Sequence, residues 1–231
     1  MRKFIVASMV LAGVVGVGSQ ASAQVAQWNV QPHGSPVDLS LSASNSDVNL
    51  AAVPALTRVG PGIAPSAAAN SFSDLSNNIT ATLNTNADYI TFTVAPAAGF
   101  QLNLTSLTWV MCGSNTAPGN GAWGFSSDGG ATWSVDQFAM TLARNTNTFN
   151  FAVNTTGSVE FRFWSWGTVS VNGGTAAKGG TIRIAQDQAN NNPELVLAGS
   201  VTAVPEPSTL SMIGFGIVGM LAFSRRRFSR N

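Results

Sequence analysis

The side chains that could carry out catalysis are few and widely spaced in this sequence. His33 is the only histidine and Cys112 the only cysteine of the 231 residues. A Ser–His–Asp relay would have to use His33, and no Gly-x-Ser-x-Gly segment presents a nucleophilic serine. A metal site with two histidines, or with several thiolates, is excluded for the same reason. We therefore expect His33 to be a solvated loop residue and Cys112 to be a buried small hydrophobic side chain.

Paired carboxylates for hydrolysis are equally scarce. Between residues 24 and 203 the only glutamates are Glu160 and Glu194, and both lie in segments with strand patterns. Glu160 alternates with Arg162, which favours an exposed ion pair over a catalytic acid. The sequence therefore predicts no catalytic residues and no enzyme activity, and a secreted hydrolase is the less favoured alternative.

One segment has the composition of a tight, self-bonded turn. The pattern Ser-x-Asp-x-Gly-x-Thr-Trp is formed by Ser126, Asp128, Gly130, Thr132 and Trp133. It resembles the Asp-box of sialidases and other β-rich exported proteins. That resemblance implies a structural hairpin in which the Asp accepts backbone hydrogen bonds, glycine supplies a positive φ and the Trp packs under the loop.

Two tryptophans are candidates for ligand contact. Trp164 and Trp166 alternate with Phe161 and Phe163, so they point outward if the phenylalanines face the core. An exposed pair of rings is typical of a sugar-stacking platform, which predicts glycan contact at Trp164 and Trp166. The competing interpretations are a strand that is buried on both faces near its end, or a bulge that turns the rings inward.

No cofactor or metal site is predicted, with one open point. Carbonyl and carboxylate oxygens could hold a structural calcium ion at Asp128, or at Asp187 with Asn190–Asn192, although no Asp-x-Asp spacing supports it.

The N-terminus has the three parts of an export signal. Arg2 and Lys3 precede an apolar stretch, Phe4–Val17, and Ala21-Ser22-Ala23 has the small-x-small form of a cleavage site. We expect residues 1–23 to be a signal peptide that is cleaved between Ala23 and Gln24.

The C-terminus has three elements in a fixed order. Pro205-Glu206-Pro207 precedes an apolar run, and the basic stop Arg225, Arg226 and Arg227 follows it. The run is long enough for a transmembrane helix over about residues 207–224, with the arginines on the cytoplasmic side.

This arrangement resembles the PEP-CTERM sorting signal of Gram-negative bacteria, here residues 204–231. The resemblance implies that an exosortase-type membrane protease recognises the tail, cleaves near Pro-Glu-Pro and releases the protein to the envelope or extracellular matrix. The inner membrane would then be a transient location. Segments such as Tyr89–Val94 and Gly180–Ile184 are similar to the sandwich domain common among PEP-CTERM cargo.

The charge of the mature region differs from that of the whole chain. Residues 24–204 contain five basic and nine acidic residues, a net charge of −4, whereas the full chain has a net charge of +1. Without a basic patch, nucleic acid is not an expected partner.

The mature region reads as a series of short strands. Period-2 alternation between turn residues predicts strands in Ile90–Val94, Leu102–Leu104, Val159–Phe163 and Ile182–Ile184. Further strands are predicted at Ile79–Leu83, Leu107–Met111, Ala122–Ser126, Trp133–Phe138, Ala139–Ala143, Thr148–Val153 and Glu194–Val201. The glycines and proline of Leu56–Gly62 predict a turn or irregular crossing there.

These patterns predict an all-β protein with one domain, residues 24–203, folded as an antiparallel β-sandwich of the jelly-roll type. With the two terminal signals, they favour a non-enzymatic envelope or extracellular-matrix protein associated with exopolysaccharide. The alternative is a carbohydrate-binding module that uses exposed tryptophans.

Overall fold

The computed structural model describes residues 23–31, 33, 37–76, 78–185 and 194–205. All regular structure in these ranges is β, and the strands form two antiparallel sheets. The described residues include no helix long and apolar enough to cross a membrane. Residues 1–22, with most of the predicted signal peptide, and residues 206–231, with the predicted helix at about 207–224, lie outside these ranges.

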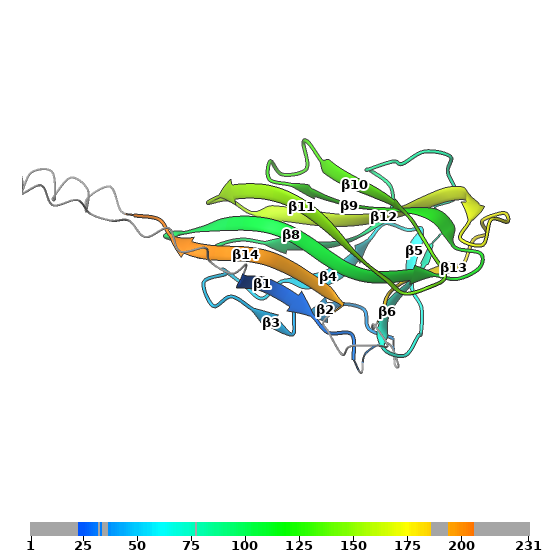
Figure 1. The fold of residues 1–231 in the computed structure, drawn as a ribbon, viewed down its shortest axis with the longest axis horizontal. Helices are drawn as coiled ribbons and strands as arrows, with labels where there is room; N and C mark the ends of the chain where they lie inside the picture. Colours follow the sequence, from blue (N-terminus) through cyan, green and yellow to red (C-terminus); the bar gives the residue numbers. More distant parts are fainter. Residues whose placement is uncertain (1–22, 32, 34–36, 77, 186–193, 206–231) are drawn as a thin grey trace, which may run out of the picture.

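The larger sheet has eight strands (Figure 1). They are β1 (Ala23–Trp28), β3 (Asn45–Ser46), β5 (Ile63–Pro65), β6 (Ser71–Ser76), β8 (Phe100–Gly113), β11 (Asn145–Thr155), β13 (Gly180–Ala185) and β14 (Leu195–Ala203). Their order is β3-β1-β14-β8-β13-β6-β5, and β11 pairs with β8 as well. One edge of β8 therefore pairs first with β14 and then with β13, and the other edge pairs with β11.

The smaller sheet has six strands in the order β10-β9-β12-β7-β4-β2. They are β2 (Leu41–Ser42), β4 (Ala55–Val59), β7 (Tyr89–Val94), β9 (Pro118–Ser126), β10 (Ser134–Ala139) and β12 (Val159–Ser170). The two sheets form the layers of a sandwich, and β14 leads to the end from which the C-terminal tail departs (Figure 1).

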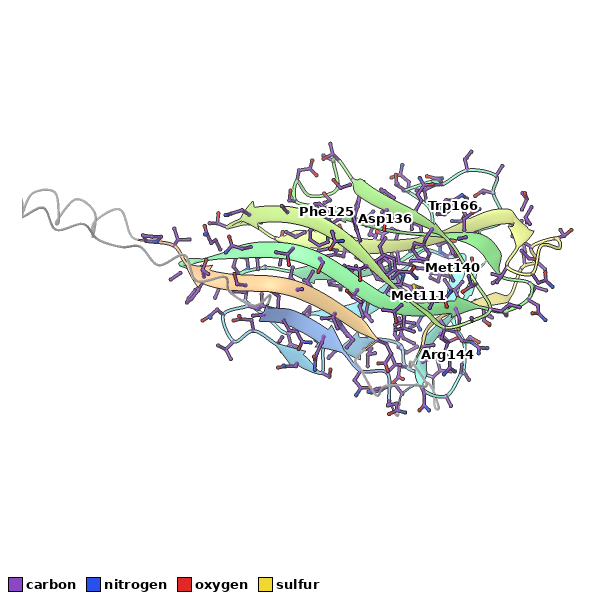
Figure 2. The ribbon with its side chains drawn as sticks, viewed as in Figure 1. Met111, Phe125, Asp136, Met140, Arg144 and Trp166 are labelled. Atoms are coloured by element: carbon purple, nitrogen blue, oxygen red, sulfur yellow. The ribbon has the colours of Figure 1, made fainter. Side chains whose placement is uncertain are left out.

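Aromatic and branched side chains from both sheets fill the space between them. Phe92 lies between Trp28, at 4.5 Å, and Phe161, at 4.8 Å between ring centroids. Phe125 near the tail end, and Met111 and Met140 toward the other end, mark the length of this layer (Figure 2). The alternation of small polar and large apolar residues along each strand thus produces one continuous core.

Most predicted strands are present, with different limits. The Leu102–Leu104 and Leu107–Met111 predictions are parts of the single strand β8, and Trp133–Phe138 corresponds to β10. A sandwich of two antiparallel sheets is therefore confirmed.

Three local predictions are wrong. Ile79–Leu83 is not a strand, and Ala139–Ala143 contributes only its first residue to β10. Within Leu56–Gly62, only the last three residues form a turn. The first four belong to β4, which pairs with β7, and Leu56 and Arg58 point inward from this strand. The glycines and the proline occupy the turn and do not interrupt the strand.

A buried ion pair connects the two sheets. The Arg58 guanidinium on β4 donates to the Asp74 carboxylate on β6, and their side chains are 8% and 0% exposed. Arg58 also donates to the carbonyls of Asp38, Leu39 and Ser73 at 2.9–3.1 Å. Its charge is thus compensated on all sides, as a buried cation requires.

Burial raises the pKa of Asp74 to about 6, although the Arg58 charge and hydrogen bond act to lower it. The folded state therefore binds a proton at Asp74 more tightly than the unfolded chain, whose pKa is near 3.8. This contribution to stability is present below pH 3.8 and is lost as the pH rises through about 6.

We predict that the unfolding free energy of the native protein, minus that of Asp74→Asn, is larger at pH 3 than at pH 7 by about 3 kcal/mol. Urea denaturation at several pH values measures both proteins, and the subtraction removes the contributions of groups that titrate in both. A difference that stays constant from pH 3 to pH 7 would show that Asp74 titrates normally.

Candidate functional site

The two tryptophans predicted as a glycan platform are buried. Trp164 is 0% exposed and Trp166 is 5% exposed. Both point away from the main core, as the alternation predicts, because Phe161 and Phe163 on the same strand are 0% exposed and face that core. The predicted direction is therefore right, but the predicted exposure is wrong.

A second apolar cluster on the outer face of the six-stranded sheet explains the burial. Trp164 and Trp166 pack with Ala122 of β9 in this cluster, and four partly buried side chains cover them: Leu83, Tyr89, Trp133 and Val135. Trp166 is labelled in Figure 2 in the part of the molecule formed by β9, β10 and β12. Residues 163–167 of β12 are thus buried on both faces, which is one of the two alternatives that the sequence left open.

Arg162 lies over two aromatic rings of this cluster, Tyr89 and Trp133. Its guanidinium lies 4.0 Å from the Tyr89 ring centroid and 4.4 Å from that of Trp133. Glu160 orients it from two residues away on the same strand, through bonds of 2.6 and 3.0 Å. Cation–π contact with both rings makes Arg162 part of the cluster and covers one face of each ring.

The Ser126–Trp133 segment forms the hairpin between β9 and β10. The Ser126 hydroxyl accepts the N–H of Gly130 at 2.8 Å and donates to Asp128 at 2.7 Å. Asp128 accepts both the N–H and the hydroxyl of Thr132, at 3.0 and 2.6 Å, and the Trp133 indole donates to the Gly130 carbonyl at 3.2 Å. Gly129 and Gly130 have φ values of 73° and 91°, which favour glycine.

These hydrogen bonds, first the one from the Thr132 hydroxyl, lower the pKa of Asp128. Both of its carboxylate oxygens are engaged inside the turn, so they are poorly placed to hold a cation. The described residues contain no group of three or more His, Cys, Asp and Glu side chains suited to a metal. The other predicted calcium ligands, Asp187 and Asn190–Asn192, lie outside the described ranges, and calcium there stays a prediction.

The remaining polar candidates are His33, Glu194 and Cys112. His33 is half-exposed, with its ring 3.4 Å from Asp38. Glu194 is buried and accepts the N–H of Val30 at 2.9 Å. The Val30 carbonyl in turn accepts the N–H of His33 at 2.8 Å, so His33 and Glu194 both lie beside Val30. Cys112 is 6% exposed, which agrees with its predicted burial.

The feature best suited to an extended ligand is the outer face of the eight-stranded sheet. Strands β11, β8, β14 and β1 lie side by side there (Figure 1) and contain no charged residue. We call this surface the neutral face. Its outward polar side chains are Gln27, Gln101, Asn103, Ser106, Thr108, Thr146, Thr148, Asn150, Asn154, Ser200 and Thr202.

The register arranges the neutral face in rows across the strands. Thr148 pairs with Thr108, and Asn150 pairs with Ser106. The Thr108 and Thr148 hydroxyls are 3.0 Å apart, and Asn103 donates to Thr202 at 2.9 Å. Neighbouring rows and strands place hydroxyls and amides at intervals of roughly 5–7 Å on a shallow surface. Such groups both donate and accept hydrogen bonds, so the face can bind an uncharged, hydroxyl-rich polymer.

Sequence reasoning missed this surface, although a signal was present. Residues 89–127 contain no charged residue, and neither do residues 145–159 or 195–205. The sequence does not reveal that β11 and β14 pair with the two edges of β8. This pairing joins the three uncharged segments into one face.

Comparison with known proteins identifies the C-terminal segment. Residues 203–227 match the PEP-CTERM protein-sorting motif, so the chain carries the sorting signal that Pro205, Glu206, Pro207 and the arginines predicted. The motif implies an exported protein that passes through a membrane and is processed by an exosortase.

No curated protein matches this sequence. Among solved structures, one similar chain is TmCBM61 in complex with beta-1,4-galactotriose. It is 12% identical, has a TM-score of 0.31, and the alignment covers 75% of this chain and 92% of that chain.

We predict that Trp164→Ala destabilises the domain by about 3–5 kcal/mol, because it removes a fully buried aromatic side chain and leaves a cavity. Thr93→Ala, at an exposed position of β7, is the matched control and should change stability by less than about 0.5 kcal/mol. Urea denaturation measures both variants. If Trp164→Ala is as stable as the control, the ring is not part of a packed cluster.

Proposed function

We propose that this chain is a non-enzymatic, exported protein of the envelope or extracellular matrix of a Gram-negative bacterium. An exosortase-type membrane protease processes its PEP-CTERM tail, the inner membrane holds the protein only transiently, and the mature domain associates with exopolysaccharide. The domain belongs to the jelly-roll class of β-sandwiches.

The observation that carries this proposal is where the sorting motif starts. Strand β14 ends at Ala203, which pairs with Phe100 of β8, and the motif begins at residue 203. The N–H of Val204 still donates to the Gly99 carbonyl at 2.8 Å. Cleavage near Pro205-Glu206-Pro207 would therefore remove the tail without breaking a strand pairing, and would release a complete sandwich.

The strand order supports the jelly-roll assignment. Strands β6 to β13 contribute the order β6-β13-β8-β11 to one sheet and β7-β12-β9-β10 to the other. The chain crosses between the sheets at nearly every connection, and each sheet interleaves early and late strands. Eight strands that fold back in this way form the two Greek keys of a jelly roll.

The neutral face supports the association with polysaccharide. Its rows of hydroxyls and amides suit a polymer that carries many hydroxyl groups and little charge. The aromatic cluster around Trp164 is less suited to stacking on a sugar, because Trp164 and Trp166 are buried and Arg162 covers one face of Tyr89 and of Trp133. A carbohydrate-binding function would thus act through hydrogen bonds across β11 and β8 and not through stacking on tryptophan.

We predict that the protein isolated from its own host ends near Pro205–Pro207 and lacks Arg225–Arg227. Mass spectrometry of the mature C-terminus checks this. Deleting the host's exosortase should give the mass of the protein with its uncleaved tail. If the protein of the normal host keeps all three arginines, the tail is a permanent anchor and not a sorting signal.

We predict that the purified protein binds host exopolysaccharide, and that the binding changes little between low and high salt because no charged side chain lies on the neutral face. The variant Thr108→Lys, in the middle of this face, should weaken binding about tenfold or more by placing an unpaired charge there. Thr93→Lys, on the other sheet, is the matched control. Equal binding by the two variants would rule out the neutral face as the contact surface.

A further inference from the structure

The end of the sandwich from which the tail departs differs from the other end in composition. Two loops meet there, residues 47–54 between β3 and β4 and residues 95–99 between β7 and β8. The N–H of Ala51 donates to the Ala95 carbonyl at 2.9 Å, and that of Ala97 donates to the Asn49 carbonyl at 2.8 Å. The bond from Val204 to Gly99 joins the departing chain to the same loops. We call these two loops with residues 203–204 the exit surface.

The exit surface is apolar and exposed. Val48 is 93% exposed and Val53 is 59% exposed, and Val48 is the most exposed large hydrophobic side chain of the described residues. Ala51, Ala52, Ala98 and Ala203 are exposed beside them. Exposed apolar side chains that are scattered singly need no explanation, but a contiguous group of them marks a contact surface.

Charge is nearly absent from the exit surface. Its one ionisable side chain is Asp47, which is half-buried and accepts the N–H of Asn49 at 2.8 Å. Asp128, in the hairpin between β9 and β10, lies at the rim of this end, two strands away from β7. The connections at the opposite end carry Asp38, Asp88, Arg144 and Lys178. The domain has a net negative charge, and the end from which the tail departs is the less charged of its two ends.

The length of the connecting chain limits how far the exit surface can lie from the membrane that the tail enters. Val204 lies three positions before the start of the proposed membrane segment, at about residue 207. A chain of three residues spans at most about 11 Å. The headgroup region on each side of the hydrocarbon core is roughly 5–8 Å thick. While the tail is inserted, the exit surface therefore lies within about 11 Å of the hydrocarbon core, in the headgroup region or directly beside it.

We propose that the exit surface is a membrane-contact surface, which docks the folded domain onto the lipid bilayer while the uncleaved tail spans it. Val48, Val53 and the alanines of the two loops enter the interface, where apolar side chains are stabilised and where an anionic surface would repel a more acidic end. The domain then stands on the membrane with its strands directed away from the bilayer. The contact orients Pro205-Glu206-Pro207 at the membrane surface. This inference rests on the proposed function, because it requires the tail to span a membrane before cleavage.

The test uses the full mature chain, residues 24–231, reconstituted into vesicles of phosphatidylethanolamine and phosphatidylglycerol. In a Cys112→Ala background, Val48→Cys carries a polarity-sensitive fluorophore. Leu142→Cys carries the same fluorophore as the matched control, because Leu142 is 51% exposed and lies at the opposite end. Fluorescence is compared between two vesicle samples, one of plain lipid and one containing lipid with bromine on the upper acyl chain. The bromine quenches fluorophores that are in contact with the interface. Flotation on a density gradient reports separately whether the tail is inserted.

We expect the chain to float with the vesicles, and the label at residue 48 to lose most of its fluorescence in brominated lipid while the label at residue 142 keeps it. Val53→Cys repeats the measurement at a second position of the exit surface and should behave as Val48→Cys does. If the chain floats but the labels at residues 48 and 53 are quenched no more than the one at residue 142, the membrane-contact surface is ruled out and the membrane-spanning tail stands. If the chain does not float, both proposals fail.

Discussion

The hydrophobic core and the neutral face both depend on strand β8. Its inward side chains, among them Leu104, Leu107 and Trp109, belong to the core, and its outward side chains lie in the middle of the neutral face. Because side chains alternate along a strand, a register error of one residue would place the core residues in solvent and the polar ones in the core. The three strands that pair with its edges, β11, β13 and β14, hold this register.

A bulge at Thr105 lets a strand of this length keep one apolar side. Leu102 and Leu104 face the core from even positions, whereas Leu107, Trp109 and Met111 face it from odd positions. The pairing of β14 shifts between Ala198 and Gly199, and that of β11 shifts between Asn150 and Val153, both opposite Thr105. The extra residue changes the phase of the alternation and bends the strand. Without it, half of β8 would present its leucines to solvent.

The few charges of the domain are placed where the fold needs them. Arg58 and Asp74 connect the sheets from inside, and Arg162 with Glu160 closes the aromatic cluster on the outside of the smaller sheet. The four strands of the neutral face contain no charged residue, and the exit surface contains only Asp47. Both proposed contacts, with polysaccharide and with lipid, therefore use surfaces that have few or no charged side chains.

Period-2 alternation and turn residues were sufficient to predict an all-β sandwich, because these patterns act over a few residues and need no distant partner. The hydrogen bonds within Ser126–Trp133 are equally local. So are the terminal signals, which are defined by residue order alone; the match at residues 203–227 agrees with this. The sequence by itself therefore determined the fold class and the sorting motif.

Only the tertiary structure decided what is exposed. The direction of Trp164 follows from its strand, but its burial depends on Leu83, Tyr89 and Trp133, which come from other parts of the chain. The neutral face likewise exists only once β11 and β14 pair with β8, and the exit surface only once residues 47–54 and 95–99 meet. Alternation specifies the side of a strand toward which a residue points. What covers that side is set by contacts between residues that are far apart in the sequence.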